Sequence, residues 1–459
     1  MLRRLVQTIA FRLVRLFYSK IEVHGRDNLP ADCPVIFVLN HPNGVLDPVL
    51  LMIALDRPVT FLSKSTLFAY AVSGWAAETF GALPVFRKRD VGKRGGAKDA
   101  EDMAARNEAT FARCRALLRD GRAMALFPEG TTHSEPELLP LRTGAARIAL
   151  SAEAETDWAM DLQMVPVGLW YENKTRFRTA VLLVVGEPFI LDDYADDYAA
   201  DTRQTARAVT ERIEEGLAAV VLQAENAQLL RGIPALAAWT APECSAADLS
   251  RRHDWAATLL DAYKKLHRTD PVRLEAIAEQ ARRYASLLQT LGIADPWRLE
   301  EPAIDRGYLA KRVLVLVLLA LPALAGFLMS YGPYRLAAVF ERVVNPKDRT
   351  QTGTIKLLGG SALVLVAWII EAVVVGWILG WLWGVALLVS APLLGYIALR
   401  WGEAWQALRE LLSYRWLRER RGGLVAMLAA RRQALAREVK EAVEAVADFR
   451  FWIGGDNDL

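Results

Sequence analysis

Cysteine is scarce in this sequence, and the few copies present lie far apart. The chain has 459 residues and three cysteines, Cys33, Cys114 and Cys244. None of them belongs to a Cys-x-x-Cys pair or lies beside a plausible histidine partner, so the sequence predicts neither a disulfide framework nor a cysteine nucleophile. We therefore expect these thiols to lie in a reducing compartment.

An excess of charge of one sign is also lacking. The 56 lysines and arginines nearly balance the 53 acidic residues and leave a net charge of +3. With no recognition motif in the sequence, this balance argues against nucleic acid as a partner. Hydrophobic residues, in contrast, make up 53% of the chain, and the mean hydropathy is positive at +0.15. This composition places part of the chain in a membrane.

Long apolar runs are confined to the last third of the sequence. Three runs are candidates for membrane segments: Val313–Tyr331, Leu357–Val375 and Trp381–Leu399. Basic residues flank the last two runs and residues 376–380 between them carry no charge, which predicts a hairpin whose tip alone crosses. If the first run crossed the membrane once, residues 335–356 would lie on the opposite face from the N-terminal part of the chain. We expect that run to enter and return, bending near Pro322–Gly326.

The rest of the chain divides by composition. Residues 2–17 combine apolar side chains at helical spacing with four arginines, which predicts an interfacial helix and not a signal peptide. Residues 231–310 are rich in alanine, leucine and charged residues and predict helices without a readable motif. The predicted segments are an amphipathic helix (1–22), a catalytic domain (23–230), a helical region (231–310), membrane segments (311–400) and a basic amphipathic tail (401–459).

Two polar stretches each follow an apolar run that is typical of a strand. Residues 40–48 read Asn-His-Pro-Asn-Gly-Val-Leu-Asp-Pro, and residues 127–133 read Phe-Pro-Glu-Gly-Thr-Thr-His. The two predicted strands would bring His41, Asp47 and Glu129 to one edge of a sheet. A histidine with two carboxylates at such an edge is typical of a catalytic site.

These stretches resemble two boxes of the phospholipid/glycerol acyltransferase superfamily, His-x4-Asp and Phe-Pro-Glu-Gly. Five residues separate the histidine from the aspartate here. In this respect the chain is similar to glycerol-3-phosphate and dihydroxyacetone-phosphate acyltransferases of the yeast type and their bacterial relatives. Gly81–Arg87 resembles a third box, Gly-x-x-Pro-Val-x-Arg, and Val165–Gly168 resembles a Val-Pro-Val strand. The resemblance implies an α/β catalytic domain like that of the glycerolphosphate acyltransferases, with a mixed sheet flanked by helices.

His41 is the candidate general base, because a neutral imidazole with an ordinary pKa of about 6.5 suits removal of an alcohol proton. Asp47 would hold the imidazole in one tautomer, and the acceptor hydroxyl would stand where a Ser-His-Asp triad has its serine. Asp47 before Pro48 is also typical of a helix N-cap, and the two roles are compatible. A plain cap and a plain loop histidine are the alternatives.

The acceptor is expected to bind around Arg87, whose planar guanidinium is able to hold a phosphate bidentately. A solvated basic turn is the alternative interpretation of Arg87. The basic residues that follow it are more typical of contacts with anionic lipid headgroups. They are Lys88, Arg89, Lys93 and Arg94. Arg142 is a second, weaker phosphate candidate. By resemblance, Glu129, Gly130 and Thr131 bind the acceptor.

A metal site is a further alternative, built from Glu129 and His133 together with His41 and Asp47. We disfavour it, because Glu129 and His133 lie in a glycine-threonine turn and not on a helix face. The chemistry of the superfamily also requires no metal. No metal and no cofactor are therefore expected.

The resemblance implies a membrane-bound O-acyltransferase of phospholipid biosynthesis. Its acyl donor would be acyl-CoA or acyl-carrier protein, acting as co-substrate, and its acceptor the hydroxyl of glycerol 3-phosphate or a lysophospholipid. The expected partners are membrane lipids, the donor and a small phosphate-bearing acceptor, at the cytoplasmic face of a bacterial inner membrane. The alternative is a non-catalytic lipid-binding or lipid-transport protein that keeps the fold and uses the hairpin with Glu371.

Overall fold

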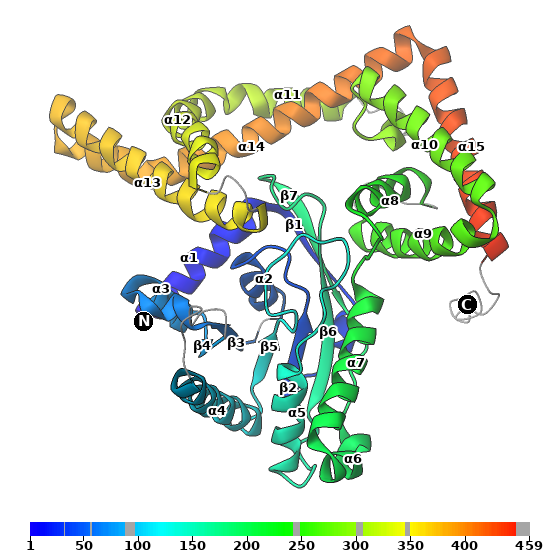
Figure 1. The fold of residues 1–459 in the computed structure, drawn as a ribbon. Coiled ribbons are helices and arrows are strands. Elements are labelled where there is room, and N and C mark those ends of the chain that lie inside the picture. The colour runs from blue at the N-terminus through cyan, green and yellow to red at the C-terminus, as the bar shows by residue number, and fades with distance from the viewer. Residues whose placement is uncertain are drawn as a thin grey trace. The chain divides into compact units, whose positions relative to one another are not determined.

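The computed structural model describes residues 1–31, 33–55, 57–87, 97–241, 248–299, 306–344 and 349–446 (Figure 1). The predicted headgroup contacts of Lys88, Arg89, Lys93 and Arg94, and Cys244, lie outside these ranges. The chain divides into two compact units. Unit 1 comprises Met1–Leu230 and Lys347–Leu357, and unit 2 comprises Arg231–Pro346 and Leu358–Leu459.

Unit 1 is built on a seven-stranded mixed sheet. Its strands are β1 (Tyr18–His24), β2 (Val35–Leu39), β3 (Val59–Lys64), β4 (Ala82–Val85), β5 (Ala123–Leu126), β6 (Gln163–Tyr171) and β7 (Thr179–Val185). They lie in the order β1-β7-β6-β2-β5-β3-β4. Every neighbouring pair is parallel except β6 and β7, which are antiparallel. The sheet and its flanking helices confirm the predicted α/β fold class.

Seven α-helices lie in the described part of unit 1 up to Val220. They are α1 (Leu2–Phe17), α2 (Leu46–Leu55), α3 (Ala71–Thr79), α4 (Ala97–Arg119), α5 (Gly144–Ala154), α6 (Ala195–Ala200) and α7 (Thr202–Val220). The predicted N-terminal helix is present, but it ends at Phe17, and residues 18–22 of the predicted segment lie in β1. Helix α5 begins directly after Thr143.

Strand β2 lies inside the sheet, and all five of its residues are buried. This is the near-continuous apolar run expected of a strand covered on both faces. Val35, Phe37 and Leu39 pack in one cluster with Leu51 of α2. Because side chains alternate along a strand, residues 36 and 38 point to the opposite face, where α5 and α7 contact β2. The sheet therefore has helices on both faces (Figure 1).

Unit 2 is helical, as its composition predicts. Its helices are α8 (Ala227–Thr240), α9 (Leu249–Thr269), α10 (Pro271–Leu291), α11 (Arg306–Leu318), α12 (Ala320–Val344), α13 (Thr352–Leu379), α14 (Trp381–Arg420) and α15 (Gly422–Val446). The first residues of α8 and of α13 belong to unit 1. Helix α14 continues without a break past residue 400, where the membrane segments were predicted to end.

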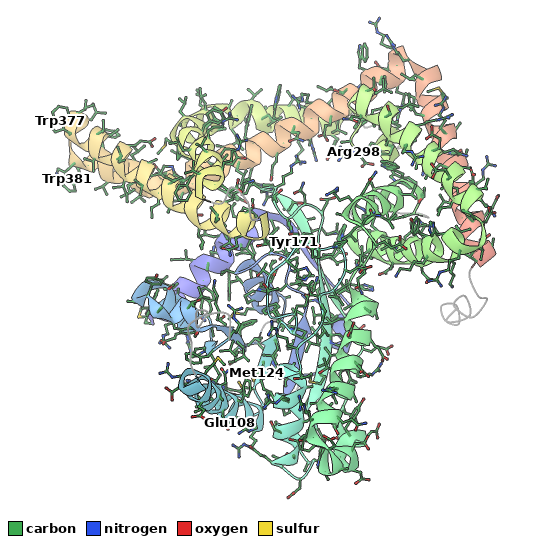
Figure 2. The ribbon with its side chains drawn as sticks, in the orientation of Figure 1. Glu108, Met124, Tyr171, Arg298, Trp377 and Trp381 are labelled. Atoms are coloured by element: carbon green, nitrogen blue, oxygen red, sulfur yellow. The ribbon has the colours of Figure 1, made fainter. Side chains whose placement is uncertain are left out.

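Two helices in the described residues, α13 and α14, are long and apolar enough to cross a membrane. Gly380 alone separates them, with a positive φ of 103°, so the tip of the hairpin is shorter than the predicted turn over residues 376–380. Trp377 and Trp381 flank this tip with exposed fractions of 87% and 70% (Figure 2).

The first predicted membrane segment, Val313–Tyr331, is broken. Helices α11 and α12 bend by 56° at a break on Leu319, so the prediction of a bend is confirmed and its position near Pro322–Gly326 is wrong. The physical reason lies in Pro322, which has no N–H to donate to the carbonyl of Leu318 and whose ring would clash with that carbonyl. The helix is therefore interrupted before the proline.

Candidate active site

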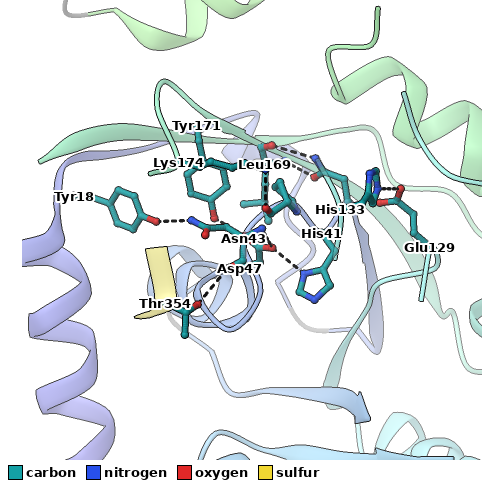
Figure 3. A network of polar contacts seen from close by, with 12 residues as sticks. Tyr18, His41, Asn43, Asp47, Glu129, His133, Leu169, Tyr171, Lys174 and Thr354 are labelled. Atoms are coloured by element: carbon teal, nitrogen blue, oxygen red, sulfur yellow. Dashed lines mark hydrogen bonds and ion pairs between the residues drawn. The ribbon is translucent and has the colours of Figure 1, made fainter. Parts of the chain in front are cut away.

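The loop between β2 and α2 holds the predicted catalytic pair. His41 Nδ1 lies 2.8 Å from Asp47 Oδ2, so the structure brings the two residues together (Figure 3). Asp47 is fully buried, whereas the His41 side chain keeps 18% of its surface exposed. Its ring stacks on Phe127, which directly follows the parallel neighbour β5, with ring centroids 4.1 Å apart. The ends of two parallel strands thus form the site.

The loop has the geometry that its residue types require. Gly44 adopts a positive φ of 58°, a conformation that glycine reaches without steric cost. This turn lets the backbone N–H of Asn43 donate to Asp47 Oδ2 at 2.8 Å. Asp47 lies inside the first turn of α2, which begins at Leu46, so its carboxylate turns back towards the loop. The plain N-cap interpretation of Asp47 is therefore wrong.

The hydrogen bond fixes the tautomer of His41. An ionised carboxylate only accepts hydrogen bonds, so Nδ1 must donate to Asp47 and carry the proton. The lone pair is then on Nε2, which is the nitrogen that a general base needs. A partly exposed imidazole held in this way is equipped to take a proton from a hydroxyl group.

The second stretch lies beside the first. The backbone N–H of His133 donates to the carbonyl oxygen of His41 at 3.3 Å. Glu129 is buried, and its Oε2 accepts from the backbone N–H of Leu139 at 2.9 Å and contacts His133 Nε2. Its other oxygen, Oε1, is buried without a hydrogen-bond partner among the described residues. Glu129 therefore has one oxygen engaged by the protein and one that is not.

Both predicted phosphate-binding arginines lie at Gly130. Arg87 Nη1 donates to the carbonyl oxygen of Gly130 at 3.1 Å. The side chain of Arg142 covers the same glycine, since a Cβ at Gly130 would lie 2.7 Å from Arg142 Nε. Gly130 has a positive φ of 67°, a backbone conformation that favours glycine. Thr131 follows it, half-buried, in the same turn.

The acidic and histidine residues of the site form two separate pairs, His41 with Asp47 and His133 with Glu129. Among the described residues, no group of three or more histidine, cysteine, aspartate or glutamate side chains has a geometry suited to a metal ion.

The sequence analysis missed several residues that surround Asp47. The hydroxyl of Tyr171, at the end of β6, donates to Asp47 Oδ1. The hydroxyl of Tyr18 accepts from Asn43 Nδ2 at 3.1 Å. Burial, and then the charge of Asp47, raise the pKa of both tyrosines above the ordinary value, so both hydroxyls stay protonated. Lys174 Nζ joins the two stretches by donating to Pro42 O at 3.2 Å and to Ser134 Oγ.

The first turn of α13 also contacts the catalytic loop, although 311 positions separate the partners in sequence. Thr354 Oγ1 donates to the carbonyl oxygen of Asn43 at 3.5 Å. Gly353 permits this approach, because a Cβ there would lie 2.7 Å from Asn43 Oδ1. Leu357 packs in the apolar cluster that contains Tyr18. No local sequence signal predicts these contacts.

Part of the sequence matches known proteins. Residues 20–170 match the sequence model of the family described as Acyltransferase, and this range contains all four boxes. The matched region, residues 20–170, has the sequence of the phospholipid/glycerol acyltransferase superfamily. Within this superfamily, glycerol-3-phosphate O-acyltransferase 2 of Saccharomyces cerevisiae is 34% identical over 130 residues, which cover 28% of this chain and 17% of the yeast protein.

Two further superfamily members are similar over longer stretches. An uncharacterised acyltransferase of Schizosaccharomyces pombe is 25% identical over 432 residues, covering 76% of this chain and 63% of that protein. A 1-acyl-sn-glycerol-3-phosphate acyltransferase of Bacillus subtilis is 24% identical over 210 residues, covering 45% of this chain and 90% of the Bacillus protein. The chain thus spans less than two thirds of the length of either yeast relative.

Proposed function

We propose that this superfamily member moves a fatty acyl group from a thioester, acyl-CoA or acyl-carrier protein, to the hydroxyl of glycerol 3-phosphate or a lysophospholipid. The observation that carries the proposal is the hydrogen bond between His41 and the buried carboxylate of Asp47, at the edge where β2 and β5 end. Acyl transfer needs a base at the attacking hydroxyl, and His41 Nε2 is free of this hydrogen bond.

The proposed reaction has two proton movements. His41 Nε2 removes the proton of the acceptor hydroxyl as its oxygen attacks the thioester carbonyl carbon, and Asp47 stabilises the imidazolium that forms. The carbon–sulfur bond then breaks, and the leaving thiolate accepts this proton from the imidazolium to become a thiol. The products are an ester and a free thiol, and the histidine returns to its starting state.

The acceptor is proposed to bind at Gly130. The guanidinium groups of Arg87 and Arg142 both lie at this glycine and provide the planar donors that phosphates prefer. Glu129 Oε1 is a buried acceptor that a substrate hydroxyl would satisfy. Glycerol 3-phosphate is the favoured acceptor, supported by the longer His–Asp spacing and by the similarity to the Saccharomyces enzyme.

The reaction is proposed to take place at a membrane. Helices α13 and α14 satisfy the length and apolarity of spanning helices. Helix α1 exposes Leu2, Leu5 and Ile9 next to its arginines, a combination suited to the surface of an anionic leaflet. Acyl chains and lysophospholipids are concentrated there.

The test is to incubate the purified full-length protein, in lipid vesicles, with labelled acyl-CoA or acyl-carrier protein and a panel of acceptors. Glycerol 3-phosphate, lysophosphatidate and glycerol form a series that varies the phosphate and the acyl chain. The proposal predicts an acylated acceptor and an equal amount of free thiol, with glycerol the poorest acceptor. Binding of lipid without any ester product would support the lipid-transport alternative.

A further inference from the structure

We propose that Tyr171 is a positioning residue for the catalytic pair, acting on His41 through the second oxygen of Asp47. This inference rests on the proposed role of His41 as general base. Tyr171 is the last residue of β6 and lies one position beyond the part of the chain that matches the family's sequence model. Its hydroxyl points at Asp47 (Figure 3).

The two oxygens of Asp47 have different partners. Oδ2 accepts from His41 Nδ1 and from the backbone N–H of Asn43, both at 2.8 Å. Oδ1 accepts from the hydroxyl of Tyr171. With donors on both oxygens, the carboxylate has one favoured orientation about its terminal torsion. Without Tyr171, that torsion would be held only from the side of His41, and a buried oxygen would lose its partner.

The hydroxyl of Tyr171 also shares the negative charge of Asp47. A donor to one oxygen of a carboxylate lowers the charge available at the other, so Tyr171 weakens the attraction between Asp47 and a protonated His41. Removing the hydroxyl should therefore favour the imidazolium and leave less free base at a given pH. The other charged groups of the site, the pair Glu129–His133 and Lys174, are not altered by this substitution.

Tyr18 provides a matched comparison. It is also a buried tyrosine in contact with Tyr171, with ring centroids 5.9 Å apart. Its hydroxyl accepts from Asn43 Nδ2, whereas the hydroxyl of Tyr171 donates to Asp47 Oδ1. Replacing either tyrosine by phenylalanine removes one buried hydroxyl, but only Tyr171→Phe removes a donor to the catalytic carboxylate.

The experiment measures acyl transfer by the full-length protein as a function of pH. Tyr171→Phe should lower kcat roughly ten- to a hundredfold, the range seen when outer partners of metal-ligating side chains are removed, and leave the KM of the acceptor near the wild-type value. The acidic limb of the kcat/KM profile should move to higher pH. Tyr18→Phe should leave this limb in place and cost a smaller part of kcat.

A second variant keeps the buried hydroxyl in place. Incorporating 3,5-difluorotyrosine at position 171 keeps the ring and the hydroxyl but makes the hydroxyl a stronger donor. The acidic limb should then move to lower pH, opposite to the effect of Tyr171→Phe. An unmoved limb in the fluorinated protein, or equal shifts in Tyr171→Phe and Tyr18→Phe, would overturn the inference. A wild-type protein inactive with every acceptor would instead refute the proposed function.

Discussion

The catalytic edge of unit 1 buries a charged side chain, whereas the apolar helices of unit 2 expose large apolar side chains. At the edge, Asp47 is fully buried yet accepts hydrogen bonds from three donors. On α13 and α14, large apolar side chains such as Trp377 are exposed instead. A sheet edge lined with its own donors holds a charge away from water, whereas α13 and α14 have the length and apolarity of helices that cross a membrane. The first region is stabilised by hydrogen bonds within the protein, and the second exposes apolar surface.

Helix α13 belongs to both regions. Its first turn contacts the catalytic loop through Thr354, and Lys356 Nζ donates to the carbonyl oxygen of Thr175 at 2.8 Å. The chain therefore leaves unit 1 at Leu230 and returns to it at Lys347. The intervening residues must cross any membrane an even number of times. A single broken span made of α11 and α12 would violate this parity, which supports the re-entrant prediction.

Membrane sidedness gives the largest expected contrast, because labelling is all-or-none. In a variant without Cys33, Cys114 and Cys244, single cysteines would replace Arg342, Ile378 and Ala430. A membrane-impermeant thiol reagent applied to intact cells should label only the cysteine at position 378, near the tip of the hairpin. Labelling at position 342 would show that α11 and α12 span fully.

Deleting Gly44 tests how strictly the catalytic loop is built. The deletion leaves four residues between His41 and Asp47, as in the His-x4-Asp box. It also removes the positive-φ turn that lets the backbone N–H of Asn43 donate to Asp47. We expect a loss of kcat of about a hundredfold or more, since misplacement near 1 Å costs that much. Deleting Gly121, a positive-φ glycine in the turn before β5 and not in the catalytic loop, is the control for shortening a turn. Full activity after deletion of Gly44 would show that Asp47 need not meet His41.

Arg87→Lys tests the acceptor site with a smaller change. Lysine keeps the charge but loses the planar fork and the hydrogen bond to Gly130 O, so the KM for glycerol 3-phosphate should rise about tenfold. The KM for the acyl donor should stay near its original value. Arg57→Lys is the matched control, because Arg57 also donates to backbone carbonyls, those of Pro30 and Gly121. Equal losses with glycerol and glycerol 3-phosphate would mean that Arg87 is structural.

The smallest effect is expected from the N-cap of α7. Asp201 accepts hydrogen bonds from the backbone N–H groups of Gln204 and Arg203, which lower its pKa. Its stabilisation is present above the ordinary aspartate pKa and is lost as the pH falls through the lower folded value. Asp201→Ala should therefore lower the melting temperature by a few degrees at pH 7 and by less below about pH 4.

Asp248→Ala shows, in comparison with Asp201→Ala, which of the two units limits thermal stability. Asp248 caps α9 of unit 2 by accepting from the backbone N–H of Arg251, so it is the counterpart of Asp201. Heat inactivation of acyl transfer should respond more to the change in unit 1 than to the change in unit 2. The opposite ranking would show that unit 2 limits the thermal stability of the site.

Local signals in the sequence predicted much of the site. Buried apolar runs located β2 and β5, and the polar stretches after them placed His41 and Asp47 at a common edge. Tyr171 and Thr354 could not be found in this way, because they reach the loop from 124 and 311 positions away. The break at Leu319 could have been predicted from the sequence, since the ring of Pro322 would clash with the carbonyl four residues earlier. Tertiary contacts, and not local secondary-structure propensities, bring the remaining residues to the site.

The central claim is that His41 is the base of an acyl transfer, and His41→Ala tests it most directly. The rate of ester formation by the full-length protein would be compared with that of the wild type and of His267→Ala, which removes an exposed histidine of α9. His41→Ala should lose about 10²–10⁴-fold in kcat with an unchanged circular dichroism spectrum, while His267→Ala stays near the wild-type rate. A folded His41→Ala protein with wild-type activity would contradict the account.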